Sequence, residues 1–171
     1  MSRNHTVSKG VWIRIFKKGT RVPTVSNSDA LDVALCYGWI TGQARSYDED
    51  SWLARFVPRR PRSIWSKINT ERAERLIIER RMKPAGLAQV QEARRDGRWD
   101  RAYSPPSRAT VPRDFAHELR KNKRAEEFFG TLDKANRYAV IFLIETAKSK
   151  TLRKAKIRRA IRMFEKGKKF H

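Results

Sequence analysis

Apolar and polar side chains alternate along three short segments early in the chain, and this period of two predicts β-strands. One segment is residues 11–17, and the other two, 39–45 and 51–57, flank the acidic run 48–50. Two strands on either side of a short polar run are typical of a β-hairpin. Pro58 then ends the second hairpin strand, because proline cannot donate a hydrogen bond to a neighbouring strand.

Elsewhere apolar residues recur at intervals of three and four, which predicts helices. Before the hairpin, Ser26 and Asp29 have the spacing of a capping box, and Gly38 suits the left-handed position that ends a helix. Asp29 and Asp32 are both expected in the first helical turn, where carboxylates favour the helix dipole. Later helices are expected at 69–80 with Asn69 as N-cap, at 84–96 with Pro84 in its first turn, after Pro112, around Phe128, at 134–147 and at 151–166.

These elements predict an α+β fold, in which helices cover a small three-stranded antiparallel sheet and the C-terminal portion is all-helical. The expected organisation is an α+β portion with the hairpin at residues 1–103, a Pro/Ser linker at 104–111 and a helical portion at 112–171. Residues 138–144 are apolar on every side, so the helix that contains them is expected to be buried.

The 171 residues carry a formal net charge of +22, which favours polyanions such as nucleic acid or, more weakly, an anionic membrane surface. Between residues 148 and 169, eleven Lys and Arg stand against one acid. Ile157, Ile161 and Phe164 share one face of this last helix, and we expect that face to pack on helix 134–147. The basic face then has three interpretations: a solvated surface, a nucleic-acid patch or a membrane-surface element.

Composition excludes several protein classes. Cys36 is the only cysteine, so the chain has no disulfide framework and no cysteine metal cluster. No apolar run approaches the roughly 20 residues needed to span a bilayer, and the first ten residues lack the apolar core of a secretory signal. The sequence therefore predicts a cytoplasmic location.

No motif for catalysis or cofactor binding is present: the sequence has no P-loop, no G-x-S-x-G and no G-x-G-x-x-G. We interpret the acidic run 48–50 as a solvated turn rather than a cation site. Helices 69–80 and 84–96 resemble a helix-turn-helix in outline, but two packed antiparallel helices give the same pattern and are favoured. We expect no cofactor and no metal. The histidines share no metal-ligand spacing: His5, His117 and His171.

Several motifs carry a resemblance to a known family. The motifs are ALCYGWI at 34–40, GQ at 42–43, RF at 55–56, PRR at 58–60, WSKIN at 65–69 and RRMKPAGL at 80–87. They resemble the bacterial YdeI/OmpD-associated family, also called OmdA-like, and the similarity extends from about Val11 to the C-terminus. The family often has Asp where this chain has Thr41. The resemblance implies a link to protection against bacteriocins and cationic peptides, and it brings no catalytic residues.

The basic loop after the hairpin is the main candidate site, because arginine forks match phosphate and carboxylate groups. Trp65 could stack on a base beside it, or it could fill the core. We expect a non-enzymatic protein that binds anionic partners through this loop and the basic last helix. The alternative is an enzyme that acts on a phosphorylated or acidic small molecule in a cleft around Arg45, Arg55 and Trp65. The candidate anion- or nucleic-acid-binding residues are Arg45, Arg55, Arg59, Arg60, Arg62, Trp65 and Lys67.

Overall fold

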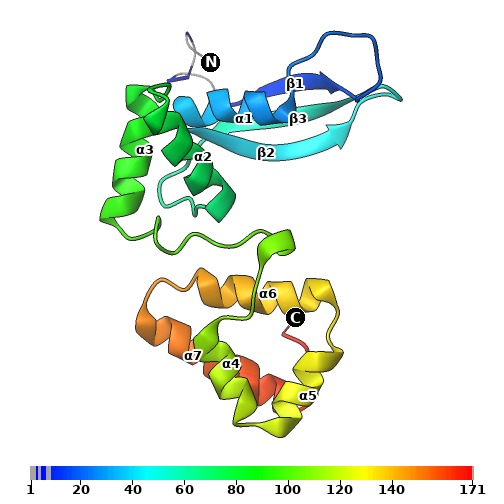
Figure 1. The fold of residues 1–171 in the computed structure, drawn as a ribbon, viewed down its shortest axis with the longest axis vertical. Helices are drawn as coiled ribbons and strands as arrows, with labels where there is room; N and C mark the ends of the chain where they lie inside the picture. The colour runs from blue at the N-terminus through cyan, green and yellow to red at the C-terminus, as the bar shows by residue number, and fades with distance from the viewer. Residues whose placement is uncertain (1–2, 4, 7–8, 171) are drawn as a thin grey trace. The chain divides into compact units, whose positions relative to one another are not determined.

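The structure is a computed structural model that describes residue 3, residues 5–6 and residues 9–170. His171 lies outside the described residues. The chain forms two compact units (Figure 1). The sheet unit consists of Met1–Ser63 with Asn69–Trp99, and the helical unit consists of Ile64–Ile68 with Asp100–His171. The predicted α+β class is confirmed.

The sheet has three antiparallel strands in the order β1-β3-β2, so the second hairpin strand is central. Their bounds are β1 Val11–Phe16, β2 Trp39–Ser46 and β3 Ser51–Pro58. The predicted strands and hairpin are therefore present. A register shift between Thr41 and Ala44 places a bulge in β2, and bulges increase the local twist of a strand.

Helix α1, Asn27–Cys36, covers one face of this sheet (Figure 1). Its capping box forms as predicted: the Ser26 hydroxyl accepts a hydrogen bond from the Asp29 N–H at 3.0 Å and donates one to the Asp29 carboxylate at 2.7 Å. Gly38 follows the helix with a φ of 76°. The core between helix and sheet contains Ile15, Ala30, Ala34, Trp39, Ala54 and Phe56.

Helix α2 is Lys67–Ile78 and α3 is Pro84–Arg95. The prediction that Asn69 caps α2 is wrong, because the helix starts two residues earlier and buries Asn69 in its first turn. The reason lies in tertiary pairing: Ser66 forms a parallel bridge with Tyr103, and the chain turns helical directly after it. Pro84 opens α3 as predicted.

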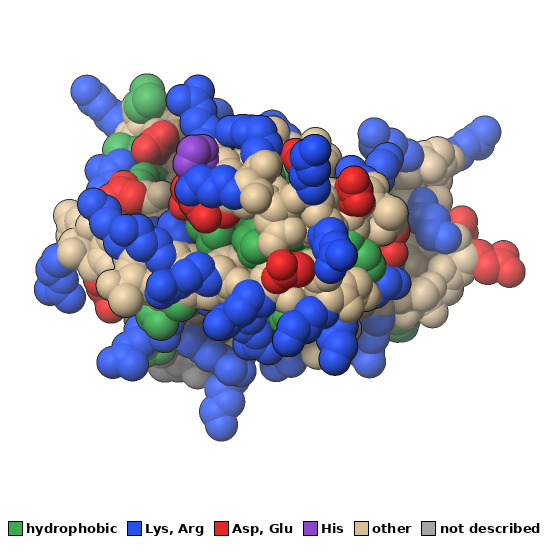
Figure 2. Space-filling view, turned by 90° about the horizontal axis from the view of Figure 1, so that it is seen from below, with side chains coloured by type: hydrophobic (Ala, Val, Ile, Leu, Met, Phe, Trp, Pro, Cys, Tyr) green, Lys and Arg blue, Asp and Glu red, His purple; other side chains and the backbone are tan. Residues whose placement is uncertain are grey.

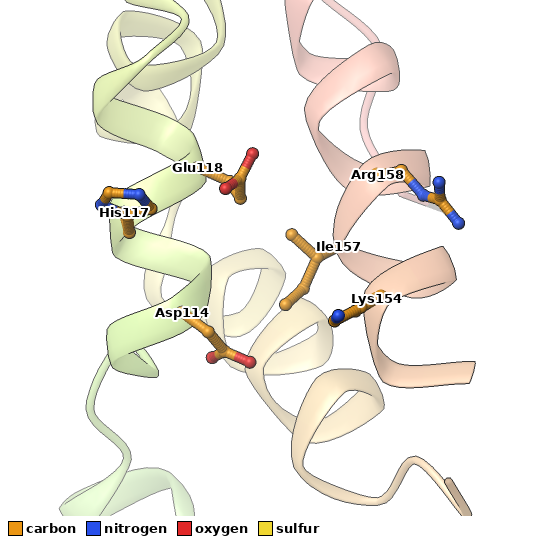
Figure 3. A pocket seen from close by; sticks show the side chains of 6 residues that line it. All are labelled: Asp114, His117, Glu118, Lys154, Ile157 and Arg158. Carbon is orange, nitrogen blue, oxygen red and sulfur yellow. The ribbon is translucent and has the colours of Figure 1, made fainter. Parts of the chain in front are cut away.

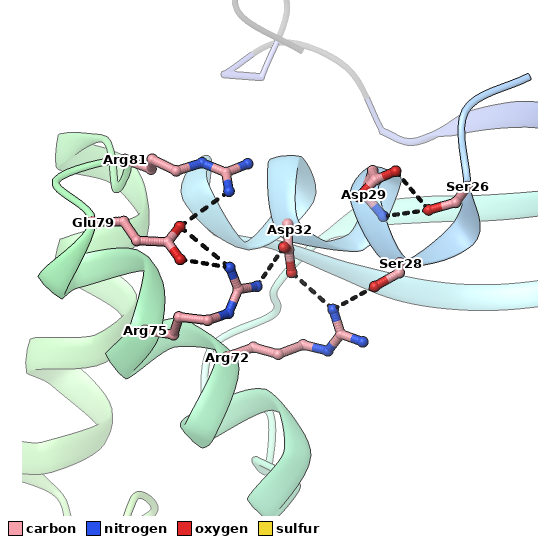
Figure 4. Close-up of polar contacts among 8 residues, drawn as sticks. All are labelled: Ser26, Ser28, Asp29, Asp32, Arg72, Arg75, Glu79 and Arg81. Carbon is pink, nitrogen blue, oxygen red and sulfur yellow. Dashed lines mark hydrogen bonds and ion pairs between the residues drawn. The ribbon is translucent and has the colours of Figure 1, made fainter.

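Asp32 ties α1 to α2 (Figure 4). The prediction that it lies in the first turn is wrong, since it sits mid-helix and is buried. Its carboxylate accepts from Arg72 at 2.8 Å and also binds Arg75, which in turn pairs with Glu79 at 2.9 Å. Burial alone would raise the pKa of Asp32, but the hydrogen bonds from Arg75 and Arg72 outweigh burial and hold the pKa below its ordinary value.

The helical unit contains four further helices, α4 Arg113–Arg120, α5 Lys123–Thr131, α6 Lys134–Glu145 and α7 Lys150–Glu165. Phe115, Val140, Ile157 and Phe164 lie in its buried core, with Ile161 packed against it. The predicted packing of the last helix is therefore confirmed. No helix in the described part of the chain is long and apolar enough to cross a membrane.

Candidate nucleic-acid interface

The sheet face opposite α1 carries an arginine and tryptophan stack. Trp12 on β1 lies directly opposite Arg55 on β3 in the strand register. The Arg55 guanidinium lies 5.8 Å from the Trp12 ring centre, and the Arg45 guanidinium from β2 lies 4.7 Å from it. One residue from each strand thus meets at a single indole, which cation–π attraction holds in place.

A second stack continues the same face along β1. The Arg14 guanidinium lies 4.4 Å from the Phe16 ring centre and 4.7 Å from the Tyr47 ring centre. Asp48 pairs with Arg14 at 2.5 Å and offsets part of its charge. We call the six residues of the two stacks the arginine–aromatic face: Trp12, Arg14, Phe16, Arg45, Tyr47 and Arg55.

The arginine–aromatic face is accessible to a ligand. Trp12 is 40% exposed and Tyr47 is 59% exposed. In a small sheet, large aromatic side chains normally lie in the core, where they supply much of the buried apolar area. The residues that alternate with them, such as Ile15 and Ala54, are buried under α1. Period-two alternation therefore gives this sheet one apolar inner face and one cationic, aromatic outer face.

The arginines of the basic loop differ in burial. Arg59 is buried, with 6% exposure, and its backbone N–H donates to the Gly38 carbonyl at 3.1 Å. Arg60 and Arg62 are exposed. Trp65 belongs to the helical unit and is 2% exposed, so it offers no free ring face for stacking, whereas Arg45 and Arg55 belong to the sheet unit.

Lys67 belongs to a polar cluster of the helical unit. Its ammonium donates to the Ser104 hydroxyl at 2.8 Å and pairs with Glu145 at 3.4 Å. Glu145 also accepts from the Ser104 hydroxyl and N–H, and Tyr138 donates to the Ser104 carbonyl at 3.1 Å. Ser104, the first residue of the expected linker, is buried by these contacts.

The helical unit presents many Lys and Arg side chains and fewer acids on the face that Figure 2 shows. On α7 the buried side is apolar, with Ile157, Ala160 and Phe164. The exposed side carries a basic residue at every fourth position: Lys150, Lys154, Arg158, Arg162 and Lys166. Four residues advance a helix by about 6 Å, so this series is an extended cationic surface.

A groove of about 320 Å³ separates α4 from α7 (Figure 3). Asp114 and Glu118 point into it from α4, and Ile157 points into it from α7. Asp114 is occupied by the Arg153 guanidinium, at 2.6 and 2.8 Å, and Glu118 by Lys121 at 2.7 Å. Among the described residues, no group of three or more His, Cys, Asp or Glu side chains is placed to hold a metal ion.

Sequence reasoning missed four of the six residues of the arginine–aromatic face. Arg45 and Arg55 were expected at a site, but the other four were not: Trp12, Arg14, Phe16 and Tyr47. The available signal was the alternation in residues 11–16, where two aromatic residues and Arg14 share the side opposite the apolar residues. Both sides of this strand carry large side chains. Packing in the core accounts for the apolar side, so the side with the aromatic residues needs a separate explanation.

Comparison with known families assigns both parts of the chain. Residues 1–89, more than half of the sequence, match the model of a domain of unknown function, DUF8412. The chain belongs to the DUF8412 family. Residues 108–167 match a second model, OmdA, described as bacteriocin-protection, YdeI or OmpD-associated. The expected relationship to the YdeI/OmpD-associated family is confirmed on those residues.

The two matches divide this DUF8412 protein into an N-terminal part, which contains the sheet, and the four C-terminal helices α4 to α7. The motifs quoted from residues 34–87 lie within the DUF8412 match, whereas the OmdA match covers α4 to α7. No curated protein and no solved structure matched the chain.

Proposed function

We propose that the protein binds single-stranded nucleic acid on the arginine–aromatic face. The observation that carries this proposal is Trp12, which is 40% exposed on the sheet, with the guanidinium groups of Arg45 and Arg55 at 4.7 and 5.8 Å from its ring centre. An exposed aromatic ring stacks on any base, and guanidinium groups beside it pair with the phosphates that flank the base. Sheets that present aromatic residues to unpaired bases are an established mode of RNA recognition.

The chemistry favours nucleic acid over other polyanions. A purely electrostatic surface needs cations but no rings, whereas a single nucleic-acid strand offers both phosphates for the cations and bases for the rings. Here three aromatic side chains alternate with three arginines on one sheet. An open sheet also suits an extended strand better than a small molecule, which is normally enclosed in a pocket. A non-enzymatic binding role follows from the same open surface.

The basic series on α7 supplies a second, diffuse attraction in this proposal. Such a charge series accelerates encounter and adds salt-sensitive affinity without selecting a sequence. A role in tolerance to bacteriocins or cationic peptides would be indirect, because a chain with a net charge of +22 repels cationic peptides.

Fluorescence anisotropy with a labelled 12-nucleotide oligo(U) tests the proposal across a salt series. We expect Trp12→Ala to weaken binding about five- to tenfold or more at every salt concentration with little change in salt slope, because stacking releases few counterions. We expect Arg45→Gln with Arg55→Gln to reduce the slope of log affinity against log salt by about 1 to 1.5, the value for two phosphates on a single strand.

Two matched charge variants control this experiment. Lys83→Gln with Arg95→Gln removes the same charge from exposed positions at the two ends of α3, and we expect a smaller effect. Arg60→Gln with Arg62→Gln tests the basic loop in the same way. Equal losses in all three double variants would reduce the proposal to non-specific attraction. Binding of the parent to anionic vesicles but not to oligo(U) would overturn it in favour of a membrane surface.

A further inference from the structure

A cavity of about 610 Å³ lies where β1 ends and the following loop returns toward α1. This loop arches beyond the end of the sheet in Figure 1. The apolar part of the lining includes Phe16, Val22 and Trp52, and the polar part includes Lys17, Lys18 and Asn27. The volume falls in the range of small-molecule sites, about 300–1,000 Å³.

Hydrogen bonds hold the walls of this cavity in place. The Phe16 N–H donates to the Thr24 hydroxyl at 3.2 Å across the mouth of the loop. The Lys17 N–H donates to the Asp50 carbonyl at 2.7 Å, and the Thr20 hydroxyl donates to the Lys17 carbonyl at 3.1 Å. A cavity with a fixed frame needs less ordering when a ligand enters.

The lining has the chemistry of a nucleotide site. Trp52 lies on the α1 side of the sheet, opposite Ile15 in the strand register, and supplies apolar ring surface for a planar base. The Asn27 amide can both donate to and accept from a base edge. Lys17 and Lys18 are exposed cations that suit a phosphate, and no acid is found among the described residues that line the cavity.

We infer that this cavity binds one nucleotide, with the base on the Trp52 ring and the phosphate at Lys17 and Lys18. The inference rests on the proposed function, because Phe16, the last residue of β1, belongs both to the cavity lining and to the arginine–aromatic face. A nucleic-acid strand that runs along β1 on that face and passes the end of β1 comes to the cavity. The same chemistry fits a free nucleotide, and the experiment separates these two sources.

Isothermal titration calorimetry of the full chain with AMP, ribose 5-phosphate and 12-nucleotide oligo(U) tests the inference. We expect AMP to bind at least about fivefold more tightly than ribose 5-phosphate, the effect of one stacked base. We expect Lys17→Gln with Lys18→Gln to weaken both small ligands. Asn27→Asp adds a carboxylate inside the cavity at the start of α1, where a negative charge does not harm the helix, and we expect it to weaken AMP.

The control is Lys166→Gln with Lys168→Gln, which removes the same charge from exposed positions of the helical unit. The inference is overturned if AMP and ribose 5-phosphate bind equally, or if the control weakens AMP as much as the Lys17 and Lys18 changes do. Weaker oligo(U) binding in the Lys17 and Lys18 variant assigns the cavity to the strand. Unchanged oligo(U) binding with weaker AMP binding assigns it to free nucleotides.

Failure of the cavity and failure of the proposed function give different results. If oligo(U) binds and Trp12→Ala weakens it, but AMP shows no preference over ribose 5-phosphate, the cavity inference is wrong and the arginine–aromatic face stands. If AMP binds as expected and oligo(U) does not bind, the arginine–aromatic face is wrong and the cavity stands as a site for free nucleotides.

Discussion

Trp12 and Trp39 show how one residue type serves two purposes on one sheet. Trp39 is 1% exposed, fills the core beneath α1, and its indole N–H donates to the His5 carbonyl at 3.1 Å. Trp12 is 40% exposed, and the guanidinium groups of Arg45 and Arg55 lie 4.7 and 5.8 Å from its ring centre. Burial assigns the first to stability, and exposure leaves the second available for the proposed recognition of nucleic acid.

Alanine substitution separates these two roles. We expect Trp39→Ala to lower the free energy of unfolding by about 3–5 kcal/mol, the usual loss for a buried tryptophan. We expect Trp12→Ala to lower it by less than about 1 kcal/mol, because surface substitutions have small effects. Urea denaturation measures both values. Similar losses in the two variants would contradict the assignment of Trp12 to the surface.

The sequence left Trp65 open between stacking on a base and filling the core, and the burial of Arg59 could not be predicted from the local sequence. Arg59, Arg60 and Arg62 look equivalent in a Pro-rich run, yet only Arg59 is buried, with its N–H bonded to the carbonyl of Gly38. Trp65 is buried through pairing of its segment with residues near Tyr103. Both outcomes depend on partners distant in sequence, which no periodicity reports.

Two glycines within helices, Gly86 and Gly130, differ in how much room a side chain would have. Gly86 in the first turn of α3 meets the C-terminal end of α1, and a Cβ atom there would lie 2.4 Å from the Cys36 carbonyl oxygen and 2.6 Å from that of Leu35. Gly130 in α5 has nothing within 4 Å of the position of a Cβ. Only the first glycine is required by packing.

We therefore expect Gly86→Ala to lower the free energy of unfolding by about 1–3 kcal/mol, since the backbone of α1 or α3 must shift. Gly130→Ala is the matched control, and we expect it to raise the free energy by up to about 1 kcal/mol, the normal gain for alanine in a helix. Thermal unfolding followed by circular dichroism measures both signs. A stabilising Gly86→Ala change would show that α1 and α3 do not approach this closely.

The Asp32 cluster makes the joint between α1 and α2 sensitive to acid. The folded pKa of Asp32 lies below the ordinary value of 3.8, so its stabilising effect is complete above that value and is lost as the pH falls through the folded pKa. We expect Asp32→Asn to lower the free energy of unfolding by about 1.5–3 kcal/mol at neutral pH. We expect the difference from the parent to shrink below about pH 4.

Urea denaturation from pH 7 to pH 3 measures this difference, with Glu49→Gln in the exposed hairpin turn as the control for loss of one carboxylate. A constant difference at all pH values would contradict the ion pairs of Asp32 with Arg72 and Arg75. The sequence did not indicate this cluster, because an acid on the first turns of a helix is normally explained by the helix dipole.

The strands and helices could be predicted from the sequence, because each follows from the local spacing of apolar residues. The capping box at Ser26, the left-handed Gly38 and the hairpin all depend on neighbours within a few residues. The start of α2 was not predictable, because the pairing of Ser66 with Tyr103 overrides the capping preference of Asn69. Long-range pairing is therefore the point at which local rules fail in this chain.

The net charge of +22 acts on the whole molecule. Repulsion among so many cations destabilises a compact state, and salt screens it. We expect the melting temperature to rise by about 2–8 °C between 0.05 M and 0.3 M sodium chloride, which corresponds to about 1 kcal/mol less repulsion. Calorimetry measures the melting temperature in sodium chloride and in a neutral osmolyte. Screening of charge raises it in sodium chloride only, whereas a general solvent effect raises it in both. A melting temperature that falls with salt would instead indicate dominance of favourable ion pairs such as those of Asp32.

The chain crosses between its two units three times, because Ile64–Ile68 belongs to the helical unit although residues on both sides of it belong to the sheet unit. No single cut can therefore yield both units intact. A nick at residues 104–111 leaves Trp65 and Lys67 on one fragment and Glu145 on the other. Fragments 1–103 and 104–171 each lack part of the helical unit, and we expect the two fragments to reassemble on mixing, as the halves of a split protein do.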